Sequence, residues 1–301
     1  MVSQTPSAYN PAPGSVKRQG SLVVPELPEV ETVVRDLRPY LIGRRFTRVR
    51  AGPRALRRRW VAQWNGKLAE REVRSIRRRG KWIVLELDDA ASLVIHLGMT
   101  GQLTVVPSNL AVASHTHLFF SLDGGEQHLR FRDVRRFGSA LYLPNVGALA
   151  RFFEQMKLGP EPFELAARFW RERLAETRRC LKAVLLDQRV VAGVGNIYAD
   201  ESLFEARLHP TRCGCELTLK EAERLRRAIV KVLNRAIDYR GSTIRDYVGG
   251  SGMKGGYQDE FRVYQQTGQP CRRCQVPIEC VRLAGRSTHF CPRCQPMEAR
   301  G

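Results

Sequence analysis

The dipeptide Pro25-Glu26 carries residue types that could do covalent chemistry on a sugar. A proline whose nitrogen is free at a chain start is a secondary amine with a pKa of about 8, so a sizeable fraction is unprotonated at neutral pH. Such an amine can attack a sugar carbon and form an iminium. The carboxyl group of the adjacent Glu26 would move protons for this reaction.

The residues that follow this dipeptide predict a helix over 28–41. Pro28 suits the first turn of a helix, and Glu29 and Glu31 are favourable there because a helix N-terminus carries partial positive charge. Apolar residues then fall on one face of the helix: Val30, Val33, Val34, Leu37 and Leu41. A helix start accounts for Pro28 but not for the preceding dipeptide.

Pro25 is preceded by 24 residues in this chain. Residues 1–24 contain several Pro, Gly and Ser and no long apolar run, so we expect a disordered extension rather than a secretory signal or a transit peptide. Val24 stands where an initiator would stand, and valine codons can start translation in bacteria. Our hypothesis is that residues 1–24 reflect a gene-start error or are cleaved, which would leave the Pro25 amine free.

Four of the eight cysteines have the spacing of a metal site. Two C-x2-C pairs, separated by sixteen residues, contain Cys271, Cys274, Cys291 and Cys294. This spacing predicts a zinc ribbon in which four thiolates hold one structural Zn2+. Cys280 and His289 lie between the pairs, and we expect them to be bystanders because four ligands are already present. We interpret Cys180 as a core residue, and reduced thiols with a zinc site favour the cytoplasm.

The charge of the chain favours a polyanionic partner. The net charge is +20, and forty-two of the fifty basic residues are arginines. A GC-rich genome could explain the ratio of arginine to lysine but not the net charge, whereas nucleic acid explains it through counterion release. We interpret each of two basic runs, Arg54–Arg59 and Arg77–Lys81, as a solvated face when it is considered alone. No apolar stretch approaches the roughly 20 residues that a membrane span needs.

The order of the expected elements predicts an α+β fold with several domains. Between about residues 44 and 143, short alternating runs bounded by turn residues predict an antiparallel sandwich or barrel. The runs are Trp82–Leu87, Leu93–Leu97, Gln102–Val106, His117–Leu122, His128–Arg132 and Ser139–Leu143. After Pro144 the pattern becomes helical, near 147–157, 164–175, 179–187 and 196–206. Thr218 and Glu221 form a capping box that opens a longer helix, and five glycines within 249–256 predict a flexible loop.

Two short strings could contact nucleic acid. Gly193 and Gly195 would bring backbone N–H groups and the Asn196 amide to a helix start, which suits a phosphate; alternatively, the glycines serve only close helix packing. In the string 133–138, Arg135 and Phe137 would present a cation and an aromatic wedge that can enter a base stack. The plain alternative there is a charged hairpin with a core phenylalanine.

Taken together, these motifs resemble those of the formamidopyrimidine-DNA glycosylases, a family of bacterial base-excision repair enzymes. Five motifs occur in the family's order, in the segments 25–32, 96–101, 133–138, 194–201 and 285–288. The resemblance extends from Pro25 to about Gln295. It implies an extension over 1–24, an N-terminal catalytic β-sandwich domain with a leading helix over 25–145, a helix–two-turn–helix domain with a glycine-rich lesion loop over 146–266, and a zinc ribbon over 267–297.

The resemblance also implies roles for individual residues. Pro25 corresponds to the nucleophile and Glu26 to the proton-transfer group. Lys81 corresponds to the lysine that contacts the lesion and donates a proton in β-elimination, and Arg286 to the arginine that grips the adjacent phosphate and serves δ-elimination. The implied DNA contacts are His115, Arg135, Arg178, Asn196, Met99 and Phe137. Met99, Arg135 and Phe137 would fill the space of an extruded nucleotide, and the aligned contact near Arg178 stays open between Thr177, Arg178 and Arg179.

The implied function is that of a bifunctional DNA glycosylase and AP lyase acting on oxidised purines, namely 8-oxoguanine and formamidopyrimidines. We expect double-stranded DNA as the partner, no membrane, a monomer, and a cytoplasmic location with the nucleoid. Two alternatives stay open. One is an endonuclease VIII-type glycosylase for oxidised pyrimidines, and the other is a non-catalytic binder of damaged DNA if Pro25 stays blocked.

Overall fold

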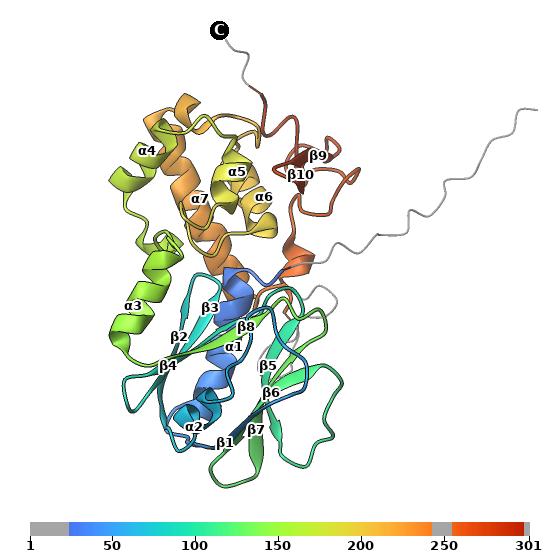
Figure 1. Cartoon of the computed structure of the whole chain (residues 1–301). Helices are drawn as coiled ribbons and strands as arrows, with labels where there is room; N and C mark the ends of the chain where they lie inside the picture. The colour runs from blue at the N-terminus through green and yellow to red at the C-terminus, as the bar shows by residue number, and fades with distance from the viewer. Residues whose placement is uncertain (1–23, 243–254, 298–301) are drawn as a thin grey trace, which may run out of the picture.

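The computed structural model describes residues 24–242 and 255–297. The chain forms an N-terminal β-rich half and a C-terminal helical half, with a small two-stranded ribbon beside the helices (Figure 1). The predicted disordered extension over 1–24 lies outside the described residues except for Val24, and so does most of the predicted flexible loop over 249–256, including Gly249, Gly250 and Gly252. Within them, no helix is both long and apolar enough to cross a bilayer.

The N-terminal half is the predicted β-sandwich. Its two antiparallel sheets have the orders β1-β6-β7-β5 and β2-β3-β4-β8. The strands are β1 (Phe46–Ala51), β2 (Val73–Arg79), β3 (Trp82–Leu87), β4 (Ser92–His96), β5 (Gly101–Pro107), β6 (Thr116–Leu122), β7 (Gln127–Asp133) and β8 (Ser139–Leu143). Apolar side chains of both sheets meet those of helix α1 (Leu27–Leu41) in one core, which burying apolar surface stabilises.

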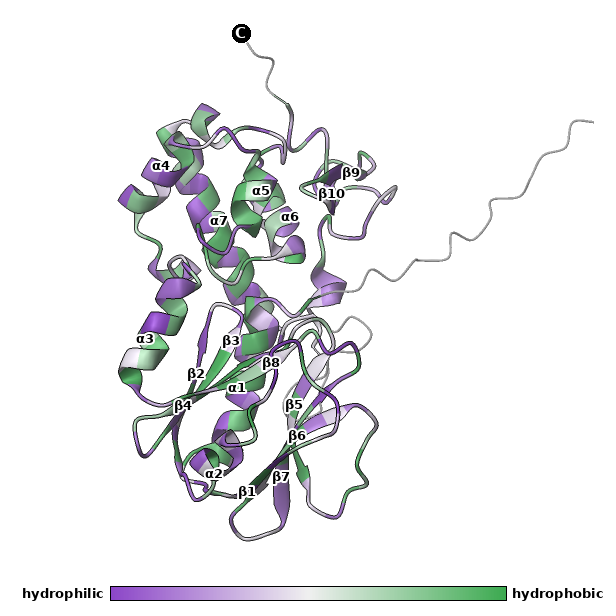
Figure 2. Cartoon of the chain, in the orientation of Figure 1, coloured by the Kyte–Doolittle hydropathy of each residue, from purple (hydrophilic) through white to green (hydrophobic). Residues whose placement is uncertain are grey.

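The helical half has the predicted helices with slightly shorter bounds. They are α3 (Val146–Gln155), α4 (Ala167–Ala175), α5 (Leu181–Leu186), α6 (Asn196–Glu205) and α7 (Leu219–Asp238), and a short α2 (Trp64–Leu68) lies in the sandwich half. The capping box at α7 is confirmed, because Thr218 Oγ1 accepts the Glu221 N–H and the Glu221 carboxylate accepts the Thr218 N–H. In Figure 2, hydrophobic residues concentrate on α5 and β3, while hydrophilic residues recur along α3 and α4.

The C-terminal ribbon pairs β9 (Glu279–Leu283) with β10 (Arg286–Phe290) in antiparallel register. Its apolar side packs on the helical half, where Phe204 of α6 and Val263 join Cys271, Ile278 and Cys291 in one buried cluster. Three short 3-10 turns complete the described structure, namely η1 (Pro162–Glu164), η2 (Gly214–Glu216) and η3 (Tyr257–Glu260).

Two expectations about individual residues are wrong. The run Arg77–Lys81 is not a solvated face throughout, because the Arg78 side chain is only 8% exposed and bonds Glu31 at 3.1 Å and Glu161 at 2.6 Å. These pairs join α1, the end of β2 and the segment after α3, so they tie the two halves together. Cys180 is half-exposed rather than a core residue.

Candidate active site and DNA-binding cleft

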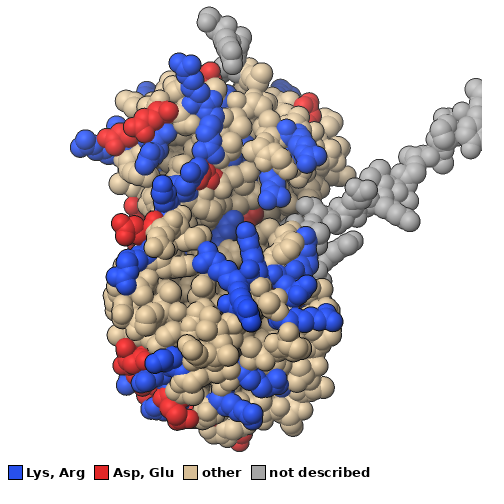
Figure 3. All heavy atoms as spheres, in the orientation of Figure 1, with Lys and Arg blue, Asp and Glu red and all other residues tan. Residues whose placement is uncertain are grey.

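A cleft of about 990 Å³ lies between the sandwich, the helical half and the ribbon. The predicted residues that line it are Glu26, Lys81, Asn196 and Arg286. Lys and Arg side chains gather along the hollow between the two halves of the molecule (Figure 3). The fold therefore brings four predicted site residues, which are far apart in the sequence, to one basic cavity that suits a polyanion.

Glu26 is held by the first turn of another helix. Its side chain, on the residue just before α1, is buried to 2% exposure. Its carboxylate accepts the N–H of Gly195 at 2.7 Å and that of Ile197 at 2.8 Å, and the Tyr198 N–H lies at 3.4 Å. Three backbone donors thus fix the orientation of the carboxyl group at the N-terminus of α6, where the helix dipole favours negative charge.

Burial and charge oppose each other at Glu26. Burial raises the pKa of this carboxyl from its usual 4.5 to about 7, against the opposite effects of the Lys81 ammonium and the backbone donors. A carboxyl group with a pKa near the working pH can both donate and accept a proton, which is the requirement for general acid–base catalysis. Glu26 therefore has the position and the electrostatics for the proton-transfer role that the sequence predicts.

The glycines before α6 serve this contact, which corrects the sequence interpretation. A Cβ on Gly195 would come within 2.4 Å of Glu26 Cδ, and one on Gly193, whose φ is +87°, within 2.6 Å of Leu27 Cδ1. The backbone N–H groups at this helix start were expected to face a phosphate, but those of Gly195 and Ile197 bind Glu26 instead. The glycines are needed for close approach of the Pro25–Leu27 segment rather than for helix packing or phosphate binding.

A second buried carboxylate supports the first. Glu29 accepts the backbone N–H of Glu26 at 2.9 Å, the Tyr198 hydroxyl at 2.6 Å and the Ser242 N–H at 2.7 Å. The pKa of the Tyr198 hydroxyl is raised well above its usual value, first by burial and then by the Glu29 charge. The sequence interpretation gave Glu29 only a helix-dipole role. The spacing of a capping box, with Glu three residues after the N-cap, was the signal that could have found it.

Lys81 sits at the hairpin turn between β2 and β3. It follows Gly80, whose φ is +57° and whose N–H donates to Glu161 at 2.6 Å. Burial lowers the pKa of Lys81, while the Glu26 and Glu29 carboxyls favour its charged form. Lys81 is thus a half-buried residue that lines the cleft with Glu26 and is subject to its charge, rather than one more surface lysine.

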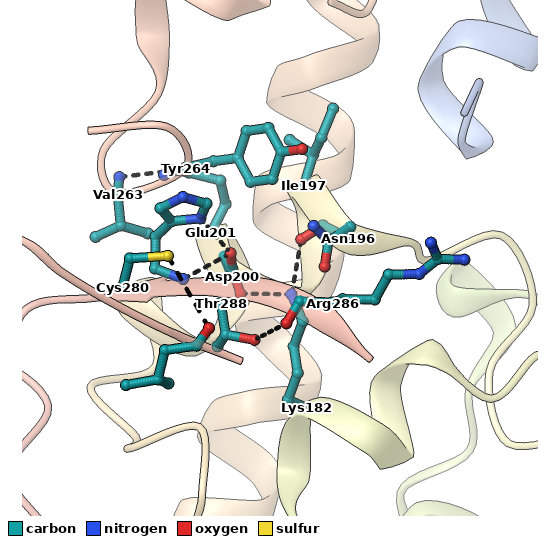
Figure 4. Close-up of polar contacts among 12 residues, drawn as sticks. Lys182, Asn196, Ile197, Asp200, Glu201, Val263, Tyr264, Cys280, Arg286 and Thr288 are labelled. Atoms are coloured by element: carbon teal, nitrogen blue, oxygen red, sulfur yellow. Dashed lines mark hydrogen bonds and ion pairs between the residues drawn. The ribbon is translucent and has the colours of Figure 1, made fainter. Parts of the chain in front are cut away.

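Asn196, Arg179 and Arg286 also line the cleft. The Asn196 Oδ1 atom is buried, yet it accepts no hydrogen bond from the part of the chain that the structure describes. Arg286 begins β10 at the tip of the ribbon, and its side chain extends away from the polar cluster around Asp200 (Figure 4). Arg178 is exposed but does not line the cleft, whereas its neighbour Arg179 does.

Met99, Arg135 and Phe137 lie outside this cleft, on two adjoining loops of the sandwich. The buried Asp133 holds the loops together, because its carboxylate accepts the Thr100 hydroxyl at 2.5 Å and the Gly138 N–H at 2.7 Å. The Arg135 guanidinium stacks on the Phe137 ring at 4.6 Å, and Phe137 is 42% exposed. Phe137 is therefore an exposed tip rather than a core residue of a hairpin.

His115 lies beside this loop pair. Its backbone is left-handed, with φ +64°, and its carbonyl accepts the Asp133 N–H at 2.9 Å. The conformation turns the chain into β6 and leaves the His115 side chain half-exposed. The structure thus brings His115 to the same edge of the sandwich as the predicted stack-filling residues.

The four predicted zinc ligands converge. The Sγ atoms of Cys271, Cys274, Cys291 and Cys294 all lie within 4.8 Å of one another. The separations of Cys271 from Cys294 and of Cys274 from Cys291 are 3.8 Å and 3.4 Å, close to the ~3.8 Å edge of a tetrahedron with Zn–S bonds of about 2.3 Å. Cys280 is exposed and His289 bonds Asp200, so both are bystanders to the metal site, as predicted.

Three family models match most of the chain. The formamidopyrimidine-DNA glycosylase N-terminal domain matches residues 24–140, the H2TH domain of the same enzymes residues 158–248, and the zinc finger found in FPG and IleRS residues 268–296. These ranges agree with the sandwich, the helical half and the ribbon.

Individual relatives agree over nearly their full length. The chain is 43% identical to formamidopyrimidine-DNA glycosylase of Desulforamulus reducens, over 90% of this chain and 99% of that protein. It is 44% identical to that of Chloroflexus aurantiacus, over 90% and 98%. A complex of Lactococcus lactis Fpg with abasic-site DNA superposes with a TM-score of 0.84 at 35% identity, over 90% of this chain and 100% of that one. A complex of a Lactococcus lactis variant with Fapy-dG DNA gives a TM-score of 0.85 at 35% identity, over 91% and 100%. The chain belongs to the formamidopyrimidine-DNA glycosylase family.

Proposed function

We propose that this protein is a bifunctional DNA glycosylase and AP lyase of base-excision repair, which removes oxidised purines from double-stranded DNA. The observation that carries the proposal is the buried Glu26 carboxyl, with its pKa raised to about 7, beside Pro25 at the wall of a basic cleft. The Lactococcus lactis Fpg complexes, whose DNA contains Fapy-dG or an abasic site, support the same class of substrate.

Pro25 supplies the nucleophile in this proposal. Its secondary amine attacks C1′ of the damaged nucleotide, the base leaves with a proton, and the amine nitrogen loses its own proton. The C1′–O4′ bond then breaks as O4′ takes a proton that Glu26 helps to deliver, which opens the sugar ring and forms the iminium. The iminium makes the C2′–H bond acidic, so loss of that proton expels the 3′ phosphate. A second elimination then expels the 5′ phosphate. Lys81 and Arg286 both line the cleft. They supply protons and neutralise the phosphates during these steps.

The amine must be free for this chemistry. In the chain as it stands, Val24 lines the cleft and Pro25 behind it is buried. We propose that the active form begins at Pro25 and lacks residues 1–24. A second function follows for the longer chain. With Pro25 joined to Val24, it binds damaged DNA without cutting it.

The remaining predicted residues hold the DNA. Asn196, Arg179 and Arg286 contact the backbone of the lesion strand, and we assign the contact near the start of α5 to Arg179 rather than Arg178 because only Arg179 lines the cleft. Met99, Arg135 and Phe137 fill the stack after the damaged nucleotide is flipped out, with His115 on a neighbouring phosphate. The protein acts as a monomer in the cytoplasm, on the nucleoid.

One zinc ion would be held by Cys271, Cys274, Cys291 and Cys294. Its chemistry is structural, because four thiolates leave no open coordination position for a water or substrate. The ribbon residues themselves place Arg286 at the cleft. The domain limits that we propose are 25–145 for the catalytic sandwich, 146–266 for the helical domain and 267–297 for the ribbon.

A panel of defined lesion duplexes tests the function. Duplexes containing 8-oxoguanine, a formamidopyrimidine, an oxidised pyrimidine or an abasic site are incubated with the chain that begins at Pro25. We expect strand cleavage of the first two and of the abasic duplex, with little cleavage of the oxidised pyrimidine. Preference for the pyrimidine would indicate an endonuclease VIII-type enzyme, and binding without cleavage would indicate a non-catalytic binder.

A further inference from the structure

A buried ion pair lies directly behind the cleft wall. The side chains of Lys182 in α5 and Asp200 in α6 are both fully buried, with Lys182 Nζ 2.5 Å from Asp200 Oδ1 (Figure 4). Charges are tolerated in an interior only when they pair and when their remaining polar atoms are also satisfied. The partners that satisfy those atoms therefore show what this pair holds in place.

Those partners belong to two different walls of the cleft. Lys182 Nζ also donates to the backbone carbonyl of Asn196 at 2.9 Å. Asp200 Oδ2 accepts the backbone N–H of His289 at 2.9 Å and lies 3.1 Å from Nδ1 of the His289 ring. The Asp200 carboxylate thus bonds strand β10 of the ribbon directly. It is linked to the first residue of α6 through Lys182.

Each of these contacts fixes a residue that faces the DNA in the proposed function. Asn196 lines the cleft at the start of α6, and Arg286 lines it at the start of β10. His289 is three residues after Arg286 on the same short strand, so the position of its N–H sets the position of that strand. A strand rises about 3.3 Å per residue, which places Arg286 about 10 Å from the anchored N–H.

We propose that Asp200 is a positioning residue for DNA incision. It fixes Asn196 and Arg286 relative to each other, so that both meet the backbone of the lesion strand together. The inference rests on the proposed function, and Asp200 acts through these two residues rather than on the substrate.

Other contacts hold the ribbon as a body, which makes the effect of Asp200 separable. Gln295 Nε2 donates to the Leu208 carbonyl at 2.8 Å, and Arg273 bonds Glu205 at 2.7 Å. These contacts remain when Asp200 is changed. Loss of the carboxylate is therefore expected to shift β10 and the Asn196 turn without releasing the ribbon or its metal.

The test uses Asp200→Asn in the chain that begins at Pro25. Asparagine keeps the shape but removes the counter-charge of Lys182. We expect about tenfold weaker binding of a duplex with a tetrahydrofuran abasic analogue, which corresponds to about 1.4 kcal/mol of lost binding free energy. We also expect a smaller share of δ-elimination among the cleaved products. Borohydride trapping gives the number of active sites to which the products are referred. About one zinc should be retained per chain. The share of δ product does not depend on how much protein is folded, so a merely structural role leaves it unchanged.

A second variant covers the case in which Asp200→Asn does not fold. Lys182→Met combined with Asp200→Leu removes both charges and leaves neither unpaired. The same loss of δ product is expected. In the Arg286→Ala background, Asp200→Asn should change the product ratio little further, because Asp200 acts on that ratio through Arg286.

Glu205→Gln is the matched control. Glu205 also joins α6 to the ribbon, through Arg273, but at a half-buried position away from β10. It should bind and cut as wild type does. Wild-type binding and product ratio in both Asp200 variants would overturn the inference. Absence of cleavage by the wild-type chain would instead overturn the proposed function, so the two failures can be told apart.

Discussion

The Glu26 site and the loop pair around Arg135 differ in how deeply their side chains are buried. Glu26 is 2% exposed and bonded by backbone donors, whereas Phe137 is 42% exposed and stacks against the Arg135 guanidinium. A proton-transfer group needs burial, because burial brings the pKa of its carboxyl to about 7. A wedge that enters a base stack needs exposure, because the stack of bases supplies the missing contacts.

The loop pair is nevertheless rigid at its base. Asp133 and Thr100 lock the two loops by buried hydrogen bonds, and the Gly98 backbone packs so close to Phe137 that a Cβ would come within 2.5 Å of the Phe137 carbonyl carbon. Chemistry and DNA distortion thus share one design feature. In each region a buried carboxylate accepts backbone N–H groups and so positions its neighbours. Glu29 accepts the N–H of Glu26, and Asp133 accepts that of Gly138.

Glu26→Gln should abolish base excision while binding to an abasic duplex persists. We expect at least about a hundredfold loss of excision rate, the usual contribution of a general acid or base. Single-turnover cleavage of an 8-oxoguanine duplex measures it, with Glu126→Gln, at an exposed position, as the control. Loss of excision and binding together would point to misfolding rather than to a catalytic role.

The raised pKa of Glu26 also makes stability depend on pH. The folded state keeps the proton that the unfolded chain has lost between pH 4.5 and about 7. Glu26 therefore contributes stability below pH 4.5, and this contribution is lost as pH rises through about 7. The shift corresponds to about 3 kcal/mol, at roughly 1.4 kcal/mol per pKa unit. Urea unfolding at pH 5 and pH 8 should show wild type losing more stability than Glu26→Gln over this range; equal losses would contradict the assignment.

Cys274→Ser or chelation should unfold the ribbon and remove about one zinc per chain. A segment of about thirty residues has too little core to fold without its metal. DNA binding and incision should weaken because Arg286 is displaced, while the melting of the larger domains changes little. Cys280→Ser, at an exposed cysteine outside the cluster, should keep its zinc. Normal binding and incision by the metal-free protein would show that the ribbon does not hold DNA.

Phe137→Ala should weaken binding to a lesion duplex by about tenfold, since stacking of an aromatic side chain with a base is worth ~1–3 kcal/mol. Phe163→Ala, at a similarly exposed position in η1, is the matched control and should bind normally. Fluorescence anisotropy with a tetrahydrofuran duplex measures both. An equal loss for the two variants would indicate a general effect of removing an exposed ring.

Arg179→Ala should weaken DNA binding a few-fold. It should also reduce the slope of log Kd against log salt concentration by about one, the value for one lost phosphate contact. Arg178→Ala should do neither. The comparison settles which arginine contacts phosphate. The opposite result would restore the register that the sequence alone favoured.

Local patterns predicted the elements well. The strands Trp82–Leu87 and Ser139–Leu143 have their predicted bounds, and the capping box at Thr218 begins α7 as expected. The four-cysteine cluster was also readable, because its spacing is set by the metal. Such features depend on neighbours in the sequence, so the sequence contains the whole signal.

Buried polar contacts between distant segments were not predictable in the same way. The N–H groups of the Gly195 turn bind Glu26, which lies 169 residues away along the chain. Arg78 meets Glu161 across 83 residues, and Asp200 meets His289 across 89. In each case the residue type allowed a solvated or phosphate-binding role as readily as a buried one. Only the packing of domains decides between them.

The most direct test of the central claim is the identity of the residue that forms the covalent intermediate. The chain beginning at Pro25 is mixed with an 8-oxoguanine duplex and borohydride, and the trapped adduct is located by peptide mass spectrometry. We predict one adduct, on the N-terminal peptide at Pro25, and no adduct from the chain that retains residues 1–24. An adduct on the Lys81 peptide, or equal trapping by both chains, would contradict it.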